Sequence, residues 1–310
     1  MRVLTGLDAV THRPKRAAVT VGVFDGVHVA HQQLIRATVR LARRQNGTSV
    51  VITFDPDPQA VLHPRSAPPA LMPLASRLRY LEELGVEWVW VMPFSKRFAR
   101  MSAEQFIRRV LIRRLRTAAL IVGDAFVFGR NRRGNMVVLQ TLGPAHGMRI
   151  IPVKPITRSG TTVSSSRIRQ LIRDGGLLQA KRLLGRAPML YGTVVRGAGR
   201  GRRLGFPTAN IRLIPQVLPP RGVYAVIIEV AGRRWRGVMN LGRRPTFGKG
   251  PLVCEVHLLG FSGTLLRRAV AVALLARLRG ERRFLSPQAL SRQVRRDIAR
   301  AQPLLAHSRS

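Results

Sequence analysis

The sequence contains few of the residues that would mark several other classes of protein. Its single cysteine, Cys254, cannot form a disulfide within the chain, which suits a reducing compartment. There are 14 acidic residues against 54 basic ones, and aromatic residues make up 5% of the chain. No apolar run approaches membrane-spanning length, and residues 1–16 lack the apolar core of a secretory signal. We therefore expect a cytoplasmic protein, and its hydrophobic content of 45% is enough to build folded cores.

The net charge of +40 comes mainly from arginine. Lysine supplies five of the 54 basic residues and arginine the other 49, which are spread over both halves of the chain. A dedicated nucleic-acid surface is more often a cluster, so we interpret this charge as a solvated basic surface that attracts small anions. Any binding of nucleic acid by such a generic surface should be weak, sequence-blind and steeply dependent on salt, whereas a dedicated nucleic-acid-binding segment is the alternative interpretation.

Hydrophobic patterning divides the 310 residues into two regions. In the first, apolar strands alternate with amphipathic helices, which predicts a parallel, doubly wound α/β sheet. The predicted strands are 17–23, 48–54, 86–92, 118–122 and 149–153, and the predicted helices are 32–44, 74–84 and 102–115. In the second region, short β-type runs separated by Gly, Pro and basic turns predict a small antiparallel β-barrel with a closing helix at 286–305. Its strands are predicted at 191–195, 222–230, 235–240, 252–259 and 269–278, and the domains at 1–187 and 188–310.

The turn after the first predicted strand is the main candidate site of the first region. Residues 22–31 read GVFDGVHVAH, so a glycine turn leads directly into a helix. This geometry points backbone N–H groups and the positive end of the helix dipole at an anion. His28 and His31 are three residues apart and would share one face of a first helical turn. A nucleotide phosphate site is one interpretation, and a structural turn whose histidines bond the backbone is the other.

Three further segments of the first region carry candidate ligand groups. They are TFDPDP at 53–58, GDAFVFG at 123–129 and VSSSRIR at 163–169. The first two follow predicted strands, at the edge where open α/β sheets bind ligands. We expect at least one of the two phenylalanines at 126 and 128 to belong to the core. The serines could simply cap a helix start, or their hydroxyls and an arginine could hold a triphosphate.

The strongest motif lies in the second region. Residues 197–210 read GAGRGRRLGFPTAN, and glycine at this density lets the backbone approach a ligand closely. A Gly/Arg run alone could be a flexible segment, but the GFPTAN ending is more specific. Three more blocks follow it: GVYA at 222–225, NLGRRPTF at 240–247 and EVH at 255–257.

Together these motifs resemble those of the bacterial bifunctional riboflavin kinase/FAD synthetase family, in the family's order and over nearly the whole chain. Residues 22–31 resemble the ATP-binding motif of nucleotidylyltransferases, and residues 205–210 resemble the riboflavin kinase motif. The resemblance implies a Rossmann-like FMN adenylyltransferase domain followed by a riboflavin kinase barrel. It also implies that riboflavin is converted to FMN and then to FAD, with ATP as co-substrate and Mg²⁺ as cofactor.

The resemblance also implies roles for individual residues. In the adenylyltransferase half, His28 and His31 would be catalytic. ATP would contact Gly22, Phe24, Asp25, Gly26, Ser164, Ser165 and Arg167, and the flavin would contact Phe54, Pro56, Phe126 and Phe128. In the kinase half, ATP would contact Gly197, Gly199, Gly205, Pro207, Thr208 and Asn240, and Mg²⁺ would be held by Thr208 and Asn210.

A kinase that phosphorylates an alcohol needs a base, which is usually a carboxylate. Between Leu190 and Gly280 the only carboxylates are Glu229 and Glu255. Glu229 precedes a glycine turn and is expected to face solvent. Glu255 lies within an apolar predicted strand, where an unpaired charge is costly. We therefore predict that Glu255 is the base and that His257 is structural.

Departures from the family pattern are more serious in the adenylyltransferase half. Ala30, Asp57 and Ala125 stand where the family usually has Gly, His, and Asp or Asn. In the kinase half, a single loop differs, with Gly260, Thr264 and Leu266 in place of Asp, Asp and Tyr. Two alternatives stay open. One is a riboflavin kinase with a weakened or degenerate adenylyltransferase half, and the other is a basic nucleic-acid-binding protein that keeps the fold.

Overall fold

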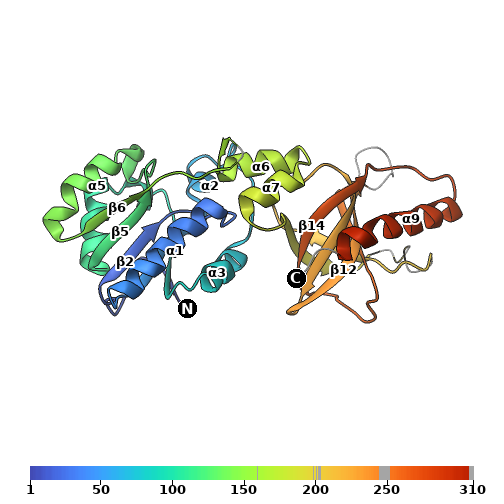
Figure 1. Cartoon of the computed structure of the whole chain (residues 1–310), viewed down its shortest axis with the longest axis horizontal. Helices are drawn as coiled ribbons and strands as arrows, with labels where there is room; N and C mark the ends of the chain where they lie inside the picture. The colour runs from blue at the N-terminus through green and yellow to red at the C-terminus, as the bar shows by residue number, and fades with distance from the viewer. Residues whose placement is uncertain (159, 198, 200, 202–203, 244–251, 307–310) are drawn as a thin grey trace. The chain divides into compact units, whose positions relative to one another are not determined.

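The computed structural model describes residues 1–158, 160–197, 199, 201, 204–243 and 252–306. The chain forms two compact units, and Figure 1 labels helices and strands of both. The first comprises Met1–Pro68 and Pro73–Ser164, and the second comprises Pro69–Met72 and Ser165–Ser310. The division by contacts thus falls between residues 164 and 165, and the functional boundary at 187 and 188 stays a prediction.

The first unit is built on a six-stranded parallel sheet in the order β1-β4-β3-β2-β5-β6. The strands are β1 (Arg2–Thr5), β2 (Ala17–Val21), β3 (Ser49–Phe54), β4 (Trp88–Met92), β5 (Thr117–Gly123) and β6 (Arg149–Val153). Every residue of β2 is buried, as in parallel sheets that are covered on both faces. The predicted α/β sheet is confirmed, and β1 is an edge strand that the sequence pattern did not indicate.

From β2 onward, helices connect the successive strands of this sheet. They are α1 (Val29–Arg44), α2 (Pro58–Leu62), α3 (Leu74–Glu83), α4 (Ala103–Phe106), α5 (Met136–Leu142), the π-helix η2 (Ile107–Arg114) and the 3-10 helices η1 (Phe98–Arg100), η3 (Arg130–Arg132) and η4 (Pro144–His146). A two-stranded hairpin of β7 (Thr157–Arg158) and β8 (Thr161–Thr162) follows β6. A capping box starts α4, because Ser102 Oγ accepts the Gln105 N–H at 3.2 Å and the Gln105 side chain accepts the Ser102 N–H at 3.1 Å.

The second unit contains a closed antiparallel barrel in the order β10-β13-β12-β11-β14-β9. The strands are β9 (Met189–Val195), β10 (Ala209–Leu213), β11 (Gly222–Val230), β12 (Arg233–Arg243), β13 (Leu252–Leu258) and β14 (Ala269–Arg279). The barrel interior is filled by large apolar side chains, among them Tyr224, Met239 and Val256. The predicted barrel is confirmed. The sequence pattern missed β10, because this strand continues directly from the Gly- and Pro-containing motif at 205–208.

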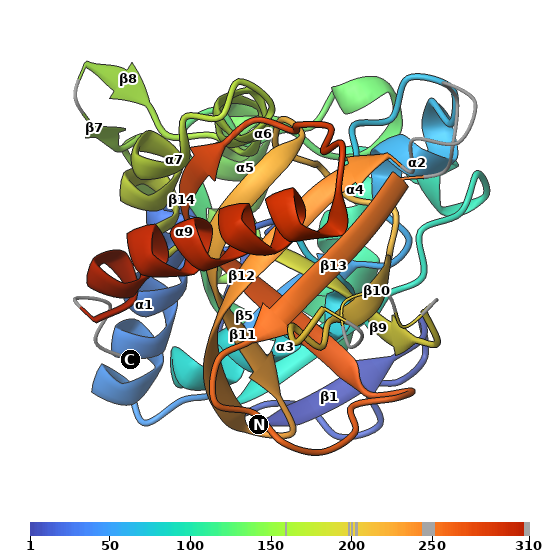
Figure 2. The same ribbon diagram turned by 90° about the vertical axis from the view of Figure 1, so that its right-hand side faces the viewer.

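Within the described residues, the second unit also contains the helices α6 (Ser165–Arg173), α7 (Leu177–Leu184) and α9 (Pro287–Ala306). Figure 2 shows α9 running across the outside of the barrel, where it contacts β11, β12 and β14. Ala301 and Leu305 of α9 are buried there against Val223 and Val238. Ser286 Oγ accepts the Ala289 N–H at 3.2 Å and so caps the helix. The predicted closing helix is therefore confirmed.

Candidate active sites

The carboxyl ends of β2, β3 and β5 bring together three predicted segments of the first unit. β2 lies between β3 and β5, and the strand order runs from it toward β4 on one side and β6 on the other. Doubly wound sheets bind ligands at such a reversal, beyond the ends of the strands. The loop after β2 carries residues 22–28, the loop after β3 carries 55–57 and the loop after β5 carries 124–129. All three segments therefore lie along one edge of the sheet.

The turn after β2 has a strained backbone. Phe24, Gly26 and Val27 have φ angles of 54°, 84° and 37°. Glycine adopts such values freely, but a β-branched residue such as Val27 rarely does. Strained conformations of this kind are concentrated at ligand sites. Asp25 and Gly26 are buried within the turn, and the Phe24 ring lies so close to Gly22 that an added Cβ there would be 3.0 Å from it.

His28 and His31 stack at the start of α1, with their ring centroids 3.5 Å apart. His28 is the N-cap of the helix, and its Nδ1 accepts the His31 N–H at 3.3 Å. Burial of the ring is the main cause that lowers the pKa of His31 well below its usual value, and the nearby His28 and Arg77 lower it further. Among the described residues, the buried His31 Nδ1 has no hydrogen-bond partner. The two imidazoles thus lie side by side, as their spacing predicts, and His31 is neutral at pH 7.

A buried arginine that the sequence motifs did not single out supports this turn. Arg77 of α3 is 5% exposed, and its Nη1 donates to Thr53 Oγ1 and to the Phe54 carbonyl, both at 3.2 Å. Thr53 Oγ1 in turn donates to the Val23 carbonyl at 3.0 Å. This network ties the end of β3 to the turn after β2. The sequence did carry a signal, since Arg77 precedes the buried Leu81 by four residues and so lies in the apolar stripe of its helix.

Carboxylates balance the buried charge of Arg77. Burial lowers the pKa of Arg77, and the carboxylates that oppose this shift are, in decreasing order of effect, Asp25, Asp57 and Asp55. Asp57 is also the N-cap of α2, where its Oδ1 accepts the Gln59 N–H at 2.8 Å. Asp57 therefore has two structural tasks at the position where the family usually has a histidine.

The phenylalanines expected at the flavin site lie in aromatic groups near this edge. Phe126 and Phe128 stack with centroids 5.3 Å apart, and Phe54 meets Phe94 edge-on at 5.8 Å. The three predicted phenylalanines are half-buried and pack against the core of the first unit. Each ring therefore contributes to the core while part of it stays accessible. Pro56 is exposed in the loop after β3.

Ala125 and Asp124 are both exposed at the end of β5. The Asp124 N–H donates to the Val153 carbonyl at 3.3 Å, which extends the pairing of β5 with β6 by one residue. The exposed position of Ala125 leaves room for the larger Asp or Asn that the family usually has there. The serine motif lies at the boundary between the units: Ser164 ends the first and Ser165 begins α6 of the second.

The position of the serine motif relative to the histidines stays a prediction. Ser164 and Ser165 are half-buried, and Arg167 is exposed on the first turn of α6.

In the barrel, strand register brings the predicted kinase residues into one row. Asn210 of β10 faces Glu255 of β13, and Glu255 faces Asn240 of β12. The row continues from Asn240 to Val223 of β11 and then to Arg279 of β14. Directly opposed residues in antiparallel strands point to the same face of the sheet, so these five side chains share one face of the barrel. We call them the barrel row.

Alternation along β13 shows that this face is the outer one. Cys254 and Val256 are buried in the barrel core, whereas Glu255 and His257 are half-buried on the other face. Burial, with a smaller effect of the adjacent Glu255 carboxylate, raises the pKa of Cys254 to about 12. His257 Nδ1 lies 2.8 Å from the Pro207 carbonyl, a contact that supports the structural role expected for it.

Glycines of the loop before β10 are required for two different reasons. A Cβ at Gly197 would lie 2.1 Å from Asn210 Nδ2, so only glycine fits there while Asn210 keeps its place. Gly199 and Gly205 are exposed and have φ angles of 70° and 79°, which favour glycine for conformational reasons. Residues 198, 200, 202–203 and 244–247 of the two kinase motifs lie outside the described residues.

The barrel row lines a cavity of about 350 Å³, within the usual range for small-molecule sites. One part of its lining is polar and includes Thr208, Asn210, Asn240 and Glu255. The other part is apolar and includes Val223, Val238, Phe284, Leu290 and Val294. The last three come from α9 and the turn before it, and we call them the α9 wall. Sequence reasoning missed this wall because it could not tell which face of α9 meets the barrel.

The polar part of the cavity offers oxygen atoms that could be ligands of a hard cation such as Mg²⁺. Thr208 is half-buried, and its Oγ1 would lie 3.0 Å from a Cβ at Gly201, while Pro207 beside it is exposed. Within the described ranges, no group of three or more His, Cys, Asp or Glu could hold a metal ion. Mg²⁺ takes few protein ligands and keeps waters and substrate phosphates, so a hydroxyl and an amide oxygen fit it.

The other glutamate of the barrel lies away from this cavity. Glu229 is on β11 opposite Arg234 of β12. It is half-buried, whereas the sequence predicted a solvent-facing side chain, because β12 extends beyond the predicted 235–240 and pairs with the end of β11. Glu255 is therefore the glutamate of the barrel strands that lines the cavity.

Two protein-family models match the chain, one in each half. A FAD synthetase family model matches residues 10–167, and a riboflavin kinase family model matches residues 184–305. Curated relatives named bifunctional riboflavin kinase/FMN adenylyltransferase match nearly the whole chain. The protein of Escherichia coli (strain K12) is 38% identical over 96% of each chain. That of Haemophilus influenzae is 35% identical over 97% of this chain and 98% of its own, and that of Pseudomonas fluorescens 36% identical over 99% of both.

A solved structure also matches along the full length. It is named a macrolide-efflux protein from Streptococcus pneumoniae, is 30% identical, and covers 97% of this chain and 99% of its own with a TM-score of 0.86. Among the residues that our structure describes, none of the helices combines the length and apolar character needed to traverse a bilayer.

Proposed function

This chain belongs to the bifunctional riboflavin kinase/FMN adenylyltransferase family, and we propose that it makes both FMN and FAD from small-molecule substrates in the cytoplasm. The barrel transfers the γ-phosphate of ATP to riboflavin. The parallel-sheet unit transfers AMP from ATP to FMN and releases pyrophosphate. The observation that carries the proposal is the register Asn210–Glu255–Asn240, which sets one carboxylate between two amides in a ligand-sized cavity.

Glu255 is the base of the kinase reaction. Its carboxylate accepts the proton of the riboflavin hydroxyl as that oxygen attacks the γ-phosphorus, and the bond from phosphorus to ADP breaks. Asn210 and Asn240 flank the carboxylate and orient the phosphate and the attacking hydroxyl. Most of the rate enhancement then comes from placing the two substrates in line.

The polar and apolar parts of the cavity lining support different positions for the two kinase substrates. The isoalloxazine ring of riboflavin is broad and largely apolar, so it binds against the α9 wall. The ATP phosphates bind on the polar side, beside Gly197, Gly199, Gly205 and Pro207 of the loop before β10. Thr208 and Asn210 hold Mg²⁺ on this side, and the ion neutralises phosphate charge when it is bound.

The adenylyltransferase reaction needs no strong base, because its nucleophile is the phosphate of FMN, which is already an anion. Charge stabilisation and positioning are the main requirements. His28 and His31 donate hydrogen bonds to the ATP phosphates at the start of α1, where the helix dipole also favours anions. The nucleotide is enclosed by the turn residues Gly22, Phe24, Asp25 and Gly26. ATP also contacts Ser164, Ser165 and Arg167. The flavin contacts Phe54, Pro56, Phe126 and Phe128.

The proposal is tested by product analysis. Purified protein is incubated with riboflavin and Mg-ATP, and in a second reaction with FMN and Mg-ATP, and the flavins are separated by chromatography. We expect FMN and ADP in the first reaction, and FAD and pyrophosphate in the second. Absence of FMN from the first reaction of folded protein would contradict the kinase assignment.

One observation favours a second candidate, a kinase whose adenylyltransferase half is weakened. Ala125 is an exposed apolar residue at a motif position that is usually Asp or Asn, and Asp57 is occupied by helix capping and by the charge of Arg77. The ratio of FAD to FMN formation in the same two reactions distinguishes this candidate from a balanced bifunctional enzyme.

A further inference from the structure

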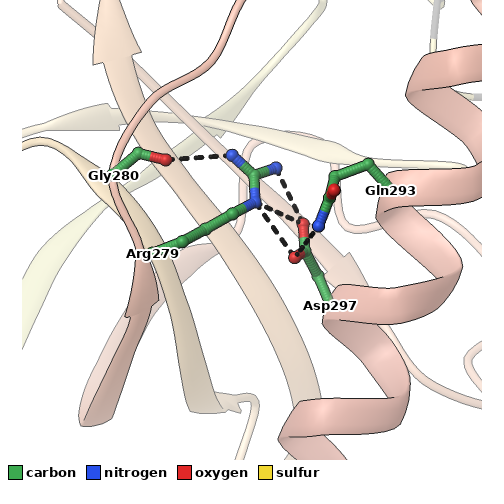
Figure 3. Close-up of polar contacts among 4 residues, drawn as sticks. All are labelled: Arg279, Gly280, Gln293 and Asp297. Atoms are coloured by element: carbon green, nitrogen blue, oxygen red, sulfur yellow. Dashed lines mark hydrogen bonds and ion pairs between the residues drawn. The ribbon is translucent and has the colours of Figure 1, made fainter.

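The barrel row ends in a buried ion pair with α9, drawn in Figure 3. Arg279 Nε lies 3.0 Å from each carboxylate oxygen of Asp297, and Nη2 lies 2.8 Å from Oδ2. Gln293 Nε2 donates to Asp297 Oδ1 at 2.9 Å, and Arg279 Nη1 donates to the Gly280 carbonyl at 2.9 Å. The two charged side chains are 11% and 2% exposed. Buried networks with every member bonded hold their geometry strictly.

On the helix side, Asp297 shares a face with the cavity wall. Leu290, Gln293 and Val294 precede Asp297 by seven, four and three residues, which places all four side chains on one face of α9. Leu290, Val294 and Asp297 all line the cavity. Holding Asp297 therefore fixes both the rotation of α9 and the depth of its apolar side chains in the cavity.

On the barrel side, Arg279 belongs to the same row as the proposed base. It is the last residue of β14 and faces Val223, which faces Asn240, which in turn faces Glu255. The spacing of these residues is set by backbone pairing between neighbouring strands. The ion pair therefore joins the α9 wall to Glu255 through a rigid series of strands.

Two contacts hold the turn between β14 and α9, one made by Arg279 and one made by Glu281. The Arg279 guanidinium lies over the Phe284 ring at 5.7 Å from its centroid. Glu281 Oε1 accepts the Arg243 N–H at 3.1 Å, and a Cβ at Gly242 would lie 2.0 Å from the same oxygen. The turn that carries Phe284 into the cavity is thus held at Arg279 and at Glu281.

We propose that Arg279 is a positioning residue of the kinase, which acts through Asp297 and Gln293 to hold the α9 wall at a fixed place relative to Glu255. This inference rests on the proposed kinase function. It means that the ion pair serves flavin placement and not only fold stability. The distinction is testable, because a buried ion pair can often be replaced by apolar side chains without loss of stability, whereas removal of one partner is strongly destabilising.

The test compares single and paired substitutions. Asp297→Asn removes one charge, the double variant Arg279→Met/Asp297→Leu replaces the pair by apolar side chains, and Gln293→Met is a milder change that removes one hydrogen bond. Each variant is examined for thermal unfolding, for riboflavin binding by flavin fluorescence, and for the KM of riboflavin and of ATP in FMN formation. Arg277→Met is the matched control, since Arg277 lies on the same strand and donates from Nη2 to the Arg221 carbonyl at 2.6 Å, away from the cavity lining.

We expect the double variant to unfold near the wild-type temperature and yet to show a KM for riboflavin raised by about tenfold, equivalent to about 1.4 kcal/mol. The KM for ATP should stay within about twofold, and Gln293→Met should raise the KM for riboflavin by a smaller factor. A folded double variant with the wild-type riboflavin KM and kcat would overturn the inference. If the double variant does not fold, the same result for Gln293→Met would overturn it. Equal rises in both KM values would overturn it as well. Wild-type protein that binds no riboflavin would instead overturn the proposed function.

Discussion

The two candidate sites of this protein are built in different ways. In the barrel, the key polar side chains stand on three neighbouring strands, and backbone pairing sets their spacing. In the first unit, the candidate groups lie on loops after three strands and at one helix start. Their arrangement depends on left-handed backbone at Phe24 and Val27 and on the buried Arg77. A strand-borne site is therefore specified by local alternation, whereas a loop-borne site depends on distant packing.

The largest expected effect separates the two sites completely. Glu255→Gln should lower FMN formation by roughly 10²- to 10⁴-fold, the range for loss of a general base. FAD formation from supplied FMN should be unchanged, because that reaction uses the other unit. Glu229→Gln is the matched control, a glutamate of the same barrel that faces Arg234 instead of the cavity. Near-normal FMN production by folded Glu255→Gln protein would remove Glu255 from the mechanism.

A second substitution tests how closely the backbone packs in the barrel site. Gly197→Ala would place a Cβ 2.1 Å from Asn210 Nδ2, so the amide must move. Since misplacement by about 1 Å can cost about 10²-fold in rate, we expect FMN formation to fall by that order. The double variant Gly197→Ala/Asn210→Ala is the control, because without the amide the added methyl has less to displace. Equal relative losses from Gly197→Ala in both backgrounds would show that the clash is not the cause.

The third prediction concerns the departures in the adenylyltransferase site. We expect wild-type FAD formation to be slower than FMN formation, and Ala125→Asp to raise it by about 10- to 10²-fold, since a missing transition-state hydrogen bond costs about 10²- to 10³-fold. Asp57→His restores the family residue but removes the α2 cap, so Asp57→Asn, which can keep the cap, is its control. If wild-type protein makes FAD as fast as FMN and no reversion raises the rate, the departures at Ala125 and Asp57 do not slow FAD formation.

Burial of His31 should make the stability of the first unit depend on pH below neutrality. The pKa of His31 lies below its usual value of 6.5 in the folded protein, mainly because the ring is buried. Below pH 6.5 the unfolded chain therefore binds a proton at His31 that the folded chain does not. The free energy of unfolding should fall on acidification by up to about 1.4 kcal/mol per pH unit until the folded ring also protonates. Thermal unfolding of wild type and His31→Asn between pH 7.5 and 5.5 measures it, and identical slopes would contradict the prediction.

The smallest expected effect is in the barrel core. With its pKa raised to about 12, mainly by burial, Cys254 is a thiol at neutral pH. We expect no reaction with a thiol reagent in the native protein over minutes and full reaction in denaturant. Glu255→Gln removes the smaller cause of the shift and should leave Cys254 unreactive. Rapid native labelling would show that the barrel opens around β13.

The sequence predicted the barrel better than the loops, for physical reasons. The bounds of β11 matched the prediction because a run of β-branched and aromatic residues begins and ends at glycine and turn residues. The single glutamate within an apolar run on β13 also predicted a polar face. By contrast, α1 begins at Val29, three residues earlier than expected, because His28 caps the helix with its ring. Histidine is not among the residues preferred at a helix N-cap, so the sequence pattern did not indicate this start.

Other features could not be read from local pattern at all. The Arg77 network joins residues more than 20 positions apart, and the Arg279–Asp297 pair joins a strand to a helix 18 residues later. The α9 wall likewise exists only once α9 is packed on the barrel. Which face packs is settled by the apolar cluster of Ala301 and Leu305 with Val223 and Val238, a set drawn from three elements. Such contacts follow from tertiary structure, so a single sequence shows which residues are present but not which of them meet.

The register of the barrel row limits how this site can change. Because side chains alternate along a strand, one inserted or deleted residue in β10, β12 or β13 would turn the proposed site residue of that strand into the apolar interior and bring a core residue to the surface. The closed barrel gives the neighbouring strands no free edge along which to slide in compensation. Variation in strand length should therefore be rare within these three strands and frequent in the turns, so that new substrate preferences arise by substitution or by loop remodelling.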